Sequence, residues 1–194
     1  MAATAHADNR SGILGAALQL FAARGYDAVG IQQIVDVAGV TKPTLYHYFG
    51  SKLGLLEELL AEHFAVLHSE LERAARYRRD LPQTLTEIAR AYFAFALAQP
   101  AFYRMQLGLL FAPLESDGLK AITHFHERQF RVVEEMFRAA AADHGNMKGR
   151  QRAYAVTFIG MIHNYVALCL NGHGKLDDKL LHQAVRQFSH GIYS

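Results

Sequence analysis

The segment from Ile31 to Lys52 limits most strongly what this chain can fold into. Its first part carries apolar residues at the spacing of one buried helical face, namely Ile31, Ile34, Val35 and Ala38. Gly39 follows, and glycine suits the positive φ at which a helix ends abruptly. Thr41 can then cap a second helix, and Pro43 falls in its first turn, where a missing N–H does no harm. Two helices joined by a short turn that contains glycine predict a helix-turn-helix, whose second helix enters the DNA major groove.

The residues of this motif resemble those of a known family. AGVTKPTLYHYFGSK, residues 38–52, resembles the most recognisable segment of the tetracycline-repressor (TetR) family of bacterial transcriptional regulators. GILGAALQLFAARGYDAVGIQQI, residues 12–34, resembles that family's first helix and its Gly-aromatic turn. The detailed resemblance covers the first quarter of the chain, and the remainder is similar in length and helical pattern. One departure is Gly30, which stands where the family usually has a Ser or Thr that caps the helix and often touches a DNA phosphate.

The pattern along the whole chain predicts an all-α protein of about nine helices. We expect an N-terminal three-helix helix-turn-helix domain at residues 1–55 and a C-terminal helical ligand-binding and dimerisation domain at residues 56–194. The first ten residues read as a short polar tail without order. Outside the motif, helices are predicted at about 11–24, 51–79, 82–99, 100–111, 116–144, 153–170 and 177–193.

The side chains of the second helix of the motif fall into an inward-packing group and a group that can contact DNA. Leu45, Tyr48 and Phe49 are expected to pack inward, whereas Lys42 and Lys52 can neutralise phosphates. The resemblance implies DNA contacts from Thr41, Lys42, Pro43, Thr44, Tyr46, His47 and Lys52. On the preceding helix, Gln32 and Gln33 can add contacts to the DNA backbone. The formal net charge of only +2 permits DNA binding without suggesting it, so the motif carries this prediction.

The stretch from Ala153 to Leu170 is apolar almost all round, which indicates burial on more than one side. A membrane span is one explanation, since the length is marginally sufficient, but His163 and Asn164 lie in its middle. We favour a helix between its own core and a second subunit. The last helix supports this with the stripe Leu180, Leu181, Ala184, Val185, Phe188 and Ile192. The last two helices of two chains would then form a four-helix bundle, and the resemblance implies the same homodimer.

The resemblance also implies a small-molecule effector of unknown identity. Aromatic and Met residues are frequent between residues 92 and 165, which favours a largely apolar or aromatic compound held by a few polar anchors. The predicted ligand-binding residues are Tyr92, Phe95, Tyr103, Arg104, Met105, Phe111, His124, Phe125, Met161, His163, Asn164 and Tyr165. A dimer that such a compound releases from a near-palindromic operator would be a repressor, as is usual in this family.

Three other functions are alternatives for this sequence. A metal-responsive regulator is suggested by the eleven histidines, but His124 and His126 should lie on opposite sides of a helix and Cys169 has no cysteine companion. An enzyme is the second alternative, although no Gly-rich phosphate loop or Gly-x-Ser-x-Gly elbow occurs. A helical adaptor that binds only protein is the third. We therefore expect no cofactor, no metal and no catalytic site, and a single cysteine without a signal peptide predicts a cytoplasmic protein.

Overall fold

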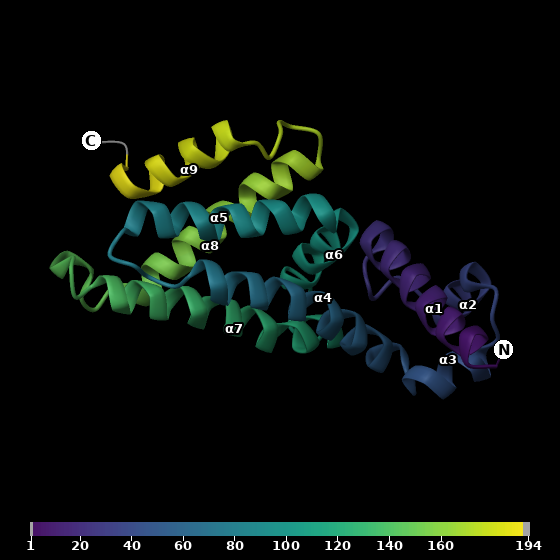
Figure 1. The fold of residues 1–194 in the computed structure, drawn as a ribbon. Helices are drawn as coiled ribbons and strands as arrows, with labels where there is room; N and C mark the ends of the chain where they lie inside the picture. Colours follow the sequence, from purple (N-terminus) through teal and green to yellow (C-terminus); the bar gives the residue numbers. More distant parts are fainter. Residues whose placement is uncertain (1, 192–194) are drawn as a thin grey trace. The chain divides into compact units, whose positions relative to one another are not determined.

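A computed structural model of the chain describes residues 2–191, with side chains described for residues 9–145 and 147–191. The described residues contain no strand, and the all-α fold predicted from the sequence is confirmed (Figure 1). The helices are α1 (Ala2–Arg24), α2 (Ile31–Ala38), α3 (Lys42–Phe49), α4 (Lys52–Ala74), α5 (Leu81–Ala98), α6 (Pro100–Leu110), α7 (Asp117–Ala140), α8 (Gln151–Leu170) and α9 (Asp178–His190). A short 3₁₀ turn, Gly145–Met147, precedes α8.

The chain forms two compact units. The N-terminal unit combines residues up to Phe64 with Ala101–His124, and the C-terminal unit combines Ala65–Pro100 with Phe125 onward. Two of the three boundaries therefore fall inside α4 and α7, and the third follows Pro100, the first residue of α6. The N-terminal unit holds α1, α2, α3, the first half of α4, α6 and the start of α7.

The N-terminal unit is built around one apolar core. Ile13, Ala17 and Phe21 of α1 repeat at a spacing of four residues and are fully buried. Ile34 of α2 and Leu45 of α3 are buried as well, and both helices pack on α1. The first half of α4 completes this core with Leu55, Leu56, Leu59, Leu60 and Phe64.

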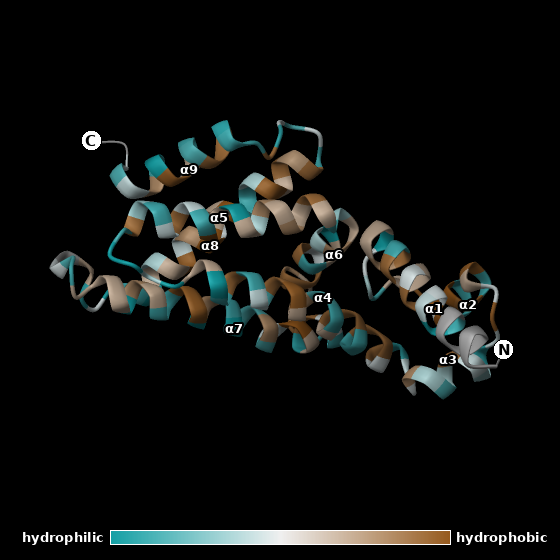
Figure 2. Cartoon of the chain, viewed as in Figure 1, coloured by the Kyte–Doolittle hydropathy of each residue, from teal (hydrophilic) through white to brown (hydrophobic). Residues whose placement is uncertain are grey.

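The C-terminal unit buries the inner faces of α5, α8 and α9. α5 packs on both α8 and α9, and Tyr92 of α5 is fully buried. Phe188 of α9 lies among aromatic rings, with its ring centroid 4.9 Å from that of Phe158 and 6.1 Å from that of Phe137. Figure 2 shows α9 as a mainly hydrophilic helix with hydrophobic residues at intervals, the pattern of a helix with one buried face.

Several helix boundaries differ from the sequence prediction. α1 begins at Ala2 rather than near residue 11, because the expected tail is rich in alanine, the strongest helix former. α4 ends at Ala74 rather than near Arg79, whose φ of +62° is left-handed. α7 likewise ends at Ala140, before the turn residues around His144. The predicted end of the last helix, near residue 193, lies outside the described residues.

Candidate functional site

The turn between α2 and α3 is formed by local capping. Gly39 has a φ of +65°, and its N–H and that of Val40 both donate to the carbonyl of Val35. This left-handed ending favours glycine because it has no Cβ to clash. Thr41 then caps α3, since its hydroxyl accepts from the N–H of Thr44 at 3.4 Å. The helix-turn-helix predicted from these residues is confirmed.

The junction of α3 and α4 depends on two further glycines. Gly50 has a φ of +70°, and the N–H of Ser51 donates to the carbonyl of Phe49 at 2.7 Å. The Ser51 hydroxyl caps α4 by accepting from the N–H of Gly54 at 2.9 Å. A Cβ at Gly54 would overlap the Phe49 carbonyl oxygen. The end of α3 and the start of α4 therefore meet at a distance that only glycine permits.

The helix α3 presents one face to solvent and buries the other. Leu45 and Phe49 are buried, and Tyr48 is half-buried, as the sequence predicted. Tyr46 is 47% exposed. The exposed residues of the predicted DNA contacts are Thr41, Lys42, Pro43, Tyr46 and His47, while Thr44 and Lys52 are half-buried. The exposed set occurs at helical spacing on one side of α3, which is the arrangement needed to enter a groove.

Lys52, one of the predicted phosphate contacts, is held by contacts within the N-terminal unit. Its ammonium donates to the carbonyl oxygens of Tyr26 at 3.1 Å and Val29 at 3.0 Å. The same nitrogen lies 4.2 Å from the centroid of the Tyr26 ring, in cation–π contact. Burial is the main cause that raises the pKa of Tyr26 to about 12, so this phenol stays neutral. Lys52 thus fixes the loop that leads into α2, which is a positioning role that the sequence did not reveal.

The two predicted contacts on α2 have partners within the helix. Gln32 donates to the Asp36 carboxylate at 2.7 Å, and the Gln33 side-chain oxygen accepts from the N–H of Gly30 at 2.9 Å. Gln33 therefore caps the backbone where Gly30 has no side chain to do so. Gln32 is exposed and Gln33 half-buried.

A buried polar cluster lies within the C-terminal unit. The Tyr92 hydroxyl of α5 donates to the side-chain oxygen of Gln129 on α7 at 2.8 Å. The His163 ring of α8 is 5.7 Å from the ring of Tyr92 and 5.7 Å from that of His126. All four side chains are buried. The Gln129 amide nitrogen has no hydrogen-bond partner among the described residues, so the cluster retains a donor for a further polar group.

The predicted effector residues differ in burial and are divided between the two units. Tyr92, Phe95, Tyr103, Met105 and His163 are buried, and Phe125 is half-buried. Phe111 is 82% exposed, and Arg104 and His124 are exposed. Met161, Asn164 and Tyr165 line an outer groove of α8. The prediction that His124 and His126 face opposite sides of one helix is confirmed, since only His126 is buried.

The comparisons with known proteins agree with this architecture. A sequence model of bacterial regulatory proteins of the tetR family matches residues 13–59, and one of the tetracyclin repressor-like C-terminal domain matches residues 85–188. The chain belongs to the TetR family. It is 29% identical over 186 residues, 95% of this chain and 82% of the relative, to the transcriptional activator FasR of Mycolicibacterium smegmatis. It is 29% identical over 148 residues, 74% of this chain and 69% of the relative, to the transcriptional repressor BdcR of Escherichia coli.

A solved structure shows the same fold. The transcriptional regulator FadR of Bacillus subtilis, in complex with stearoyl-CoA, superposes with a TM-score of 0.79 at 19% sequence identity. The match covers 94% of this chain and 99% of that one. As a member of the TetR family, the chain is a DNA-binding transcriptional regulator with a helix-turn-helix and a helical C-terminal domain.

The outer face of α8 in this TetR chain is open and largely apolar. Among the described residues α8 is the only helix long and apolar enough to cross a membrane. Of its most apolar stretch, 33% is buried inside the protein. The inner face holds Phe158, Ile162 and Val166, whereas Val156 is 45% and Leu168 49% exposed. A groove of about 450 Å³ follows the outer face, lined by Thr157, Gly160, Met161, Asn164, Tyr165 and Leu168.

Two residues of the polar cluster, His126 and Gln129, belong to the buried stripe of α7 and were not among the residues predicted for the effector site. Phe125 and Phe130 of the same helix are half-buried. The observed stripe includes Ile122, His126, Gln129, Val133, Phe137 and Ala140. The inward position of both polar residues could have been predicted from the sequence, because they lie at helical spacing from Ile122 and Val133.

The buried histidines make stability depend on pH. Burial lowers the pKa of His126 to about 4 and that of His163 to about 3, with nearby imidazoles, His68 for His126 and His126 for His163, as the second cause. The unfolded chain takes up protons near the ordinary value of 6.5 while the folded chain does not, so unfolding is favoured as the pH falls from about 6.5 toward 4. Two such groups produce a slope of up to about 2.7 kcal/mol per pH unit in this window.

We expect urea titrations at pH 7, 6 and 5 to show this loss, and the variant His126→Gln to lose stability with a slope that is smaller by up to about 1.4 kcal/mol per pH unit. The carboxylates titrate identically in both proteins, so their contribution to the pH slope of the unfolding free energy cancels in the comparison. Equal slopes would contradict neutral burial of His126.

Proposed function

We propose that the chain is a ligand-responsive repressor that binds a near-palindromic operator as a homodimer. The observation that carries the proposal is the exposed face of α3, which presents Lys42, Pro43, Tyr46 and His47 while Leu45 anchors the helix in the core. Such a face is of the right size and polarity to read a major groove. Two copies are needed because α3 is only eight residues long and the charge of the chain is small.

The proposed dimer interface lies on α8, with α9 beside it. The outer face of α8 is apolar over several turns, from Val156 to Leu168, and such a face is covered in most soluble proteins. Gly160 on this face lets a partner helix approach closely. The exposed side of α9 is polar, with Gln183, Arg186 and Gln187, and suits the rim of the interface. We therefore propose a subunit partner and a cytoplasmic location rather than a membrane.

The proposed effector is a largely apolar compound with one neutral polar group, such as a long-chain acyl thioester. The Gln129 amide donor within the buried polar cluster supports a buried carbonyl acceptor, since an unpaired buried donor is otherwise costly. The stearoyl-CoA bound by the Bacillus subtilis regulator is an example of this chemistry in the same fold. A metal effector has less support, because no group of three or more potential ligand side chains occurs within the described residues.

The division into a reader at residues 1–55 and a regulatory body at residues 56–194 is part of the proposal. α6 belongs to the same compact unit as the reader. This suits a segment that transmits a conformational change from the regulatory body to the reader. No catalytic role is proposed, and the curated relatives named above are regulators.

The experiment is a fluorescence-anisotropy titration of the full chain with the DNA upstream of its own coding sequence. We expect binding of one dimer to a two-fold site, with affinity that falls steeply with salt as several phosphates are neutralised. Adding stearoyl-CoA should release the DNA, whereas CoA alone should not. Binding independent of salt and of the two-fold sequence, or a monomer by sedimentation at micromolar concentration, would contradict the proposal.

A further inference from the structure

The loop between α1 and α2, residues 25–30, is held on one side by the start of α4. The Lys52 ammonium donates to the carbonyl oxygens of Tyr26 and Val29 in this loop. The last residue of the loop, Gly30, is the N-cap of α2. The position of the loop therefore sets where α2 begins, and α2 in turn contacts α3.

The same loop is also held by the residue that precedes α7. The Ser116 hydroxyl donates to the Asp27 carboxylate at 2.8 Å, a hydrogen bond between residues 89 positions apart in the sequence. The Ser116 oxygen also accepts from the N–H of Gly118 at 3.1 Å and so caps α7. Ser116 is buried, whereas Asp27 is exposed. One hydroxyl thus joins the loop to the first turn of α7.

Gly118 brings α7 close to this loop as well. A Cβ built on Gly118 would lie 2.6 Å from Cδ2 of Leu109 and 3.2 Å from Cδ1 of Tyr26. The backbone of α7 therefore packs on the Tyr26 ring at a distance that a larger residue would disturb. Tyr26 is also the residue whose carbonyl Lys52 binds. The first turn of α7 and the first residue of α4 thus grip the loop at the same place.

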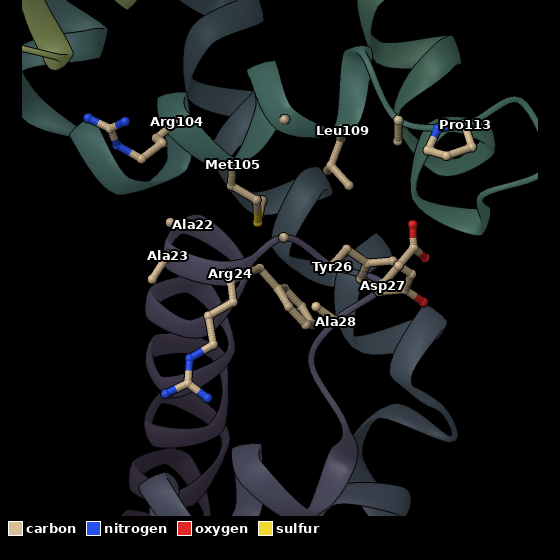
Figure 3. A pocket seen from close by; sticks show the side chains of 14 residues that line it. Ala22, Ala23, Arg24, Tyr26, Asp27, Ala28, Arg104, Met105, Leu109 and Pro113 are labelled. Carbon is tan, nitrogen blue, oxygen red and sulfur yellow. The ribbon is translucent and has the colours of Figure 1, made fainter.

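A cavity lies beside these contacts, between the loop and α6 (Figure 3). It has a volume of about 540 Å³, and its walls are residues 21–28 and residues 104–113. Leu109 points from α6 into the gap, and Tyr26 lies on the opposite side (Figure 3). All of these residues, and Ser116, belong to the N-terminal unit. Because side chains do not fill this space, the contacts of α7 beside it contribute more to fixing the loop.

We propose that Ser116 and Asp27 form a clamp by which the start of α7 positions α2 and α3 for reading DNA. The proposal rests on the DNA-reading role of α3 proposed above, and it extends the reader beyond residues 1–55 to the first turn of α7. Ser116 is a positioning residue, since its effect passes through Asp27 and the loop to α2. A displacement of the start of α7 would therefore displace α2.

The variant Ser116→Asp separates the clamp from the helix cap. Aspartate caps a helix as well as serine does, so α7 keeps its N-cap. The new carboxylate would face that of Asp27 and repel it, whereas the hydroxyl of the unmodified chain binds it. The matched control is the exchanged pair, Ser116→Asp with Asp27→Ser. It restores a hydroxyl and a carboxylate facing each other, with the composition and net charge of the unmodified chain.

DNA affinity is measured by anisotropy with the full chain and the DNA upstream of its own coding sequence. We expect Ser116→Asp to bind this DNA at least about fivefold more weakly, and the exchanged pair to recover most of the loss. Hydrogen exchange of the free chain gives a second measurement that needs no DNA. The backbone amides of residues 26–34 should exchange faster in Ser116→Asp and return to their original rates in the exchanged pair. A role in capping alone predicts no change in either measurement.

Circular dichroism and the thermal midpoint establish whether each variant is folded. If Ser116→Asp does not fold, Asp27→Ala removes the acceptor while leaving the cap of α7 intact, and it should weaken DNA binding. Asp27→Asn keeps an acceptor oxygen and should not. Unchanged DNA affinity, unchanged exchange, or an exchanged pair that recovers neither would each overturn the clamp. If the unmodified chain does not bind the DNA, the proposed function fails, and hydrogen exchange alone decides whether the clamp holds the loop.

Discussion

Replacing Gly54 by alanine should destabilise the N-terminal unit more than replacing any other of its glycines by alanine. The new Cβ would overlap the Phe49 carbonyl oxygen, and a backbone atom in a capped turn cannot move aside as a flexible side chain can. We expect the free energy of unfolding of the N-terminal unit to fall by about 3 kcal/mol, at the upper end of overpacking effects. Displacement of α3 in both subunits should weaken operator binding about 100-fold or more, corresponding to about 1.4 kcal/mol per half-site.

Gly12→Ala is the matched control for this prediction. Gly12 is also a helical glycine of the N-terminal unit, it is exposed, and nothing lies within 4 Å of a Cβ at that position. The substitution should leave operator binding unchanged and stabilise α1 by up to about 1 kcal/mol. Denaturant unfolding and anisotropy titrations of both variants measure the two effects. If Gly54→Ala were as stable as Gly12→Ala, the close approach of α4 to the end of α3 would be wrong.

Tyr46→Ala and Lys52→Met should both abolish tight operator binding, but for different reasons. The Tyr46 side chain is 47% exposed on α3, and its hydroxyl makes no hydrogen bond among the described contacts, so its loss should cost about 1–3 kcal/mol per half-site with no change in stability. In a dimer this amounts to roughly 10²-fold or more. Lys52→Met removes the donor to two carbonyls while retaining an aliphatic chain of similar length.

The Lys52 variant should therefore lose stability as well as DNA affinity. Leaving the Tyr26 and Val29 carbonyls without their partner should lower the free energy of unfolding by about 1–3 kcal/mol. Tyr77→Ala, in which the lost phenol had donated to Asp143 far along the chain, serves as a control with unchanged operator binding. Sedimentation should show that all three variants remain dimeric. If Lys52→Met keeps full stability, Lys52 acts only through phosphate contact and its positioning role is incorrect.

The helix-turn-helix could be predicted because its signals are local. Gly39 ends α2 and Thr41 starts α3 through bonds that span three to five residues, so the chain carries this geometry in any tertiary setting. The end of α4 could not be predicted in the same way. Residues 75–79 contain no proline or glycine and read as helical, yet α4 stops at Ala74 and Asp80 caps α5 by accepting from the N–H of Gln83.

The predicted effector residues show the same limit. Aromatic content selected Tyr92, which is buried, but it also selected Phe111, which is 82% exposed in the segment after α6. Composition records how many apolar side chains a helix has and not which of them face inward. Gln129, whose buried amide nitrogen is unpaired, was missed because a glutamine is expected at the surface.

The amino-acid sequence alone determined the fold class, the reading helix and the family of this chain, because helical periodicity, caps and turn glycines act between residues a few positions apart. Tertiary packing alone decided the partners of Lys52, 23 and 26 residues away, and the meeting of Tyr92 with Gln129, 37 residues away. It also created the cavity between residues 21–28 and 104–113. Contacts of this kind depend on the angle and register at which helices pack, which no local pattern encodes.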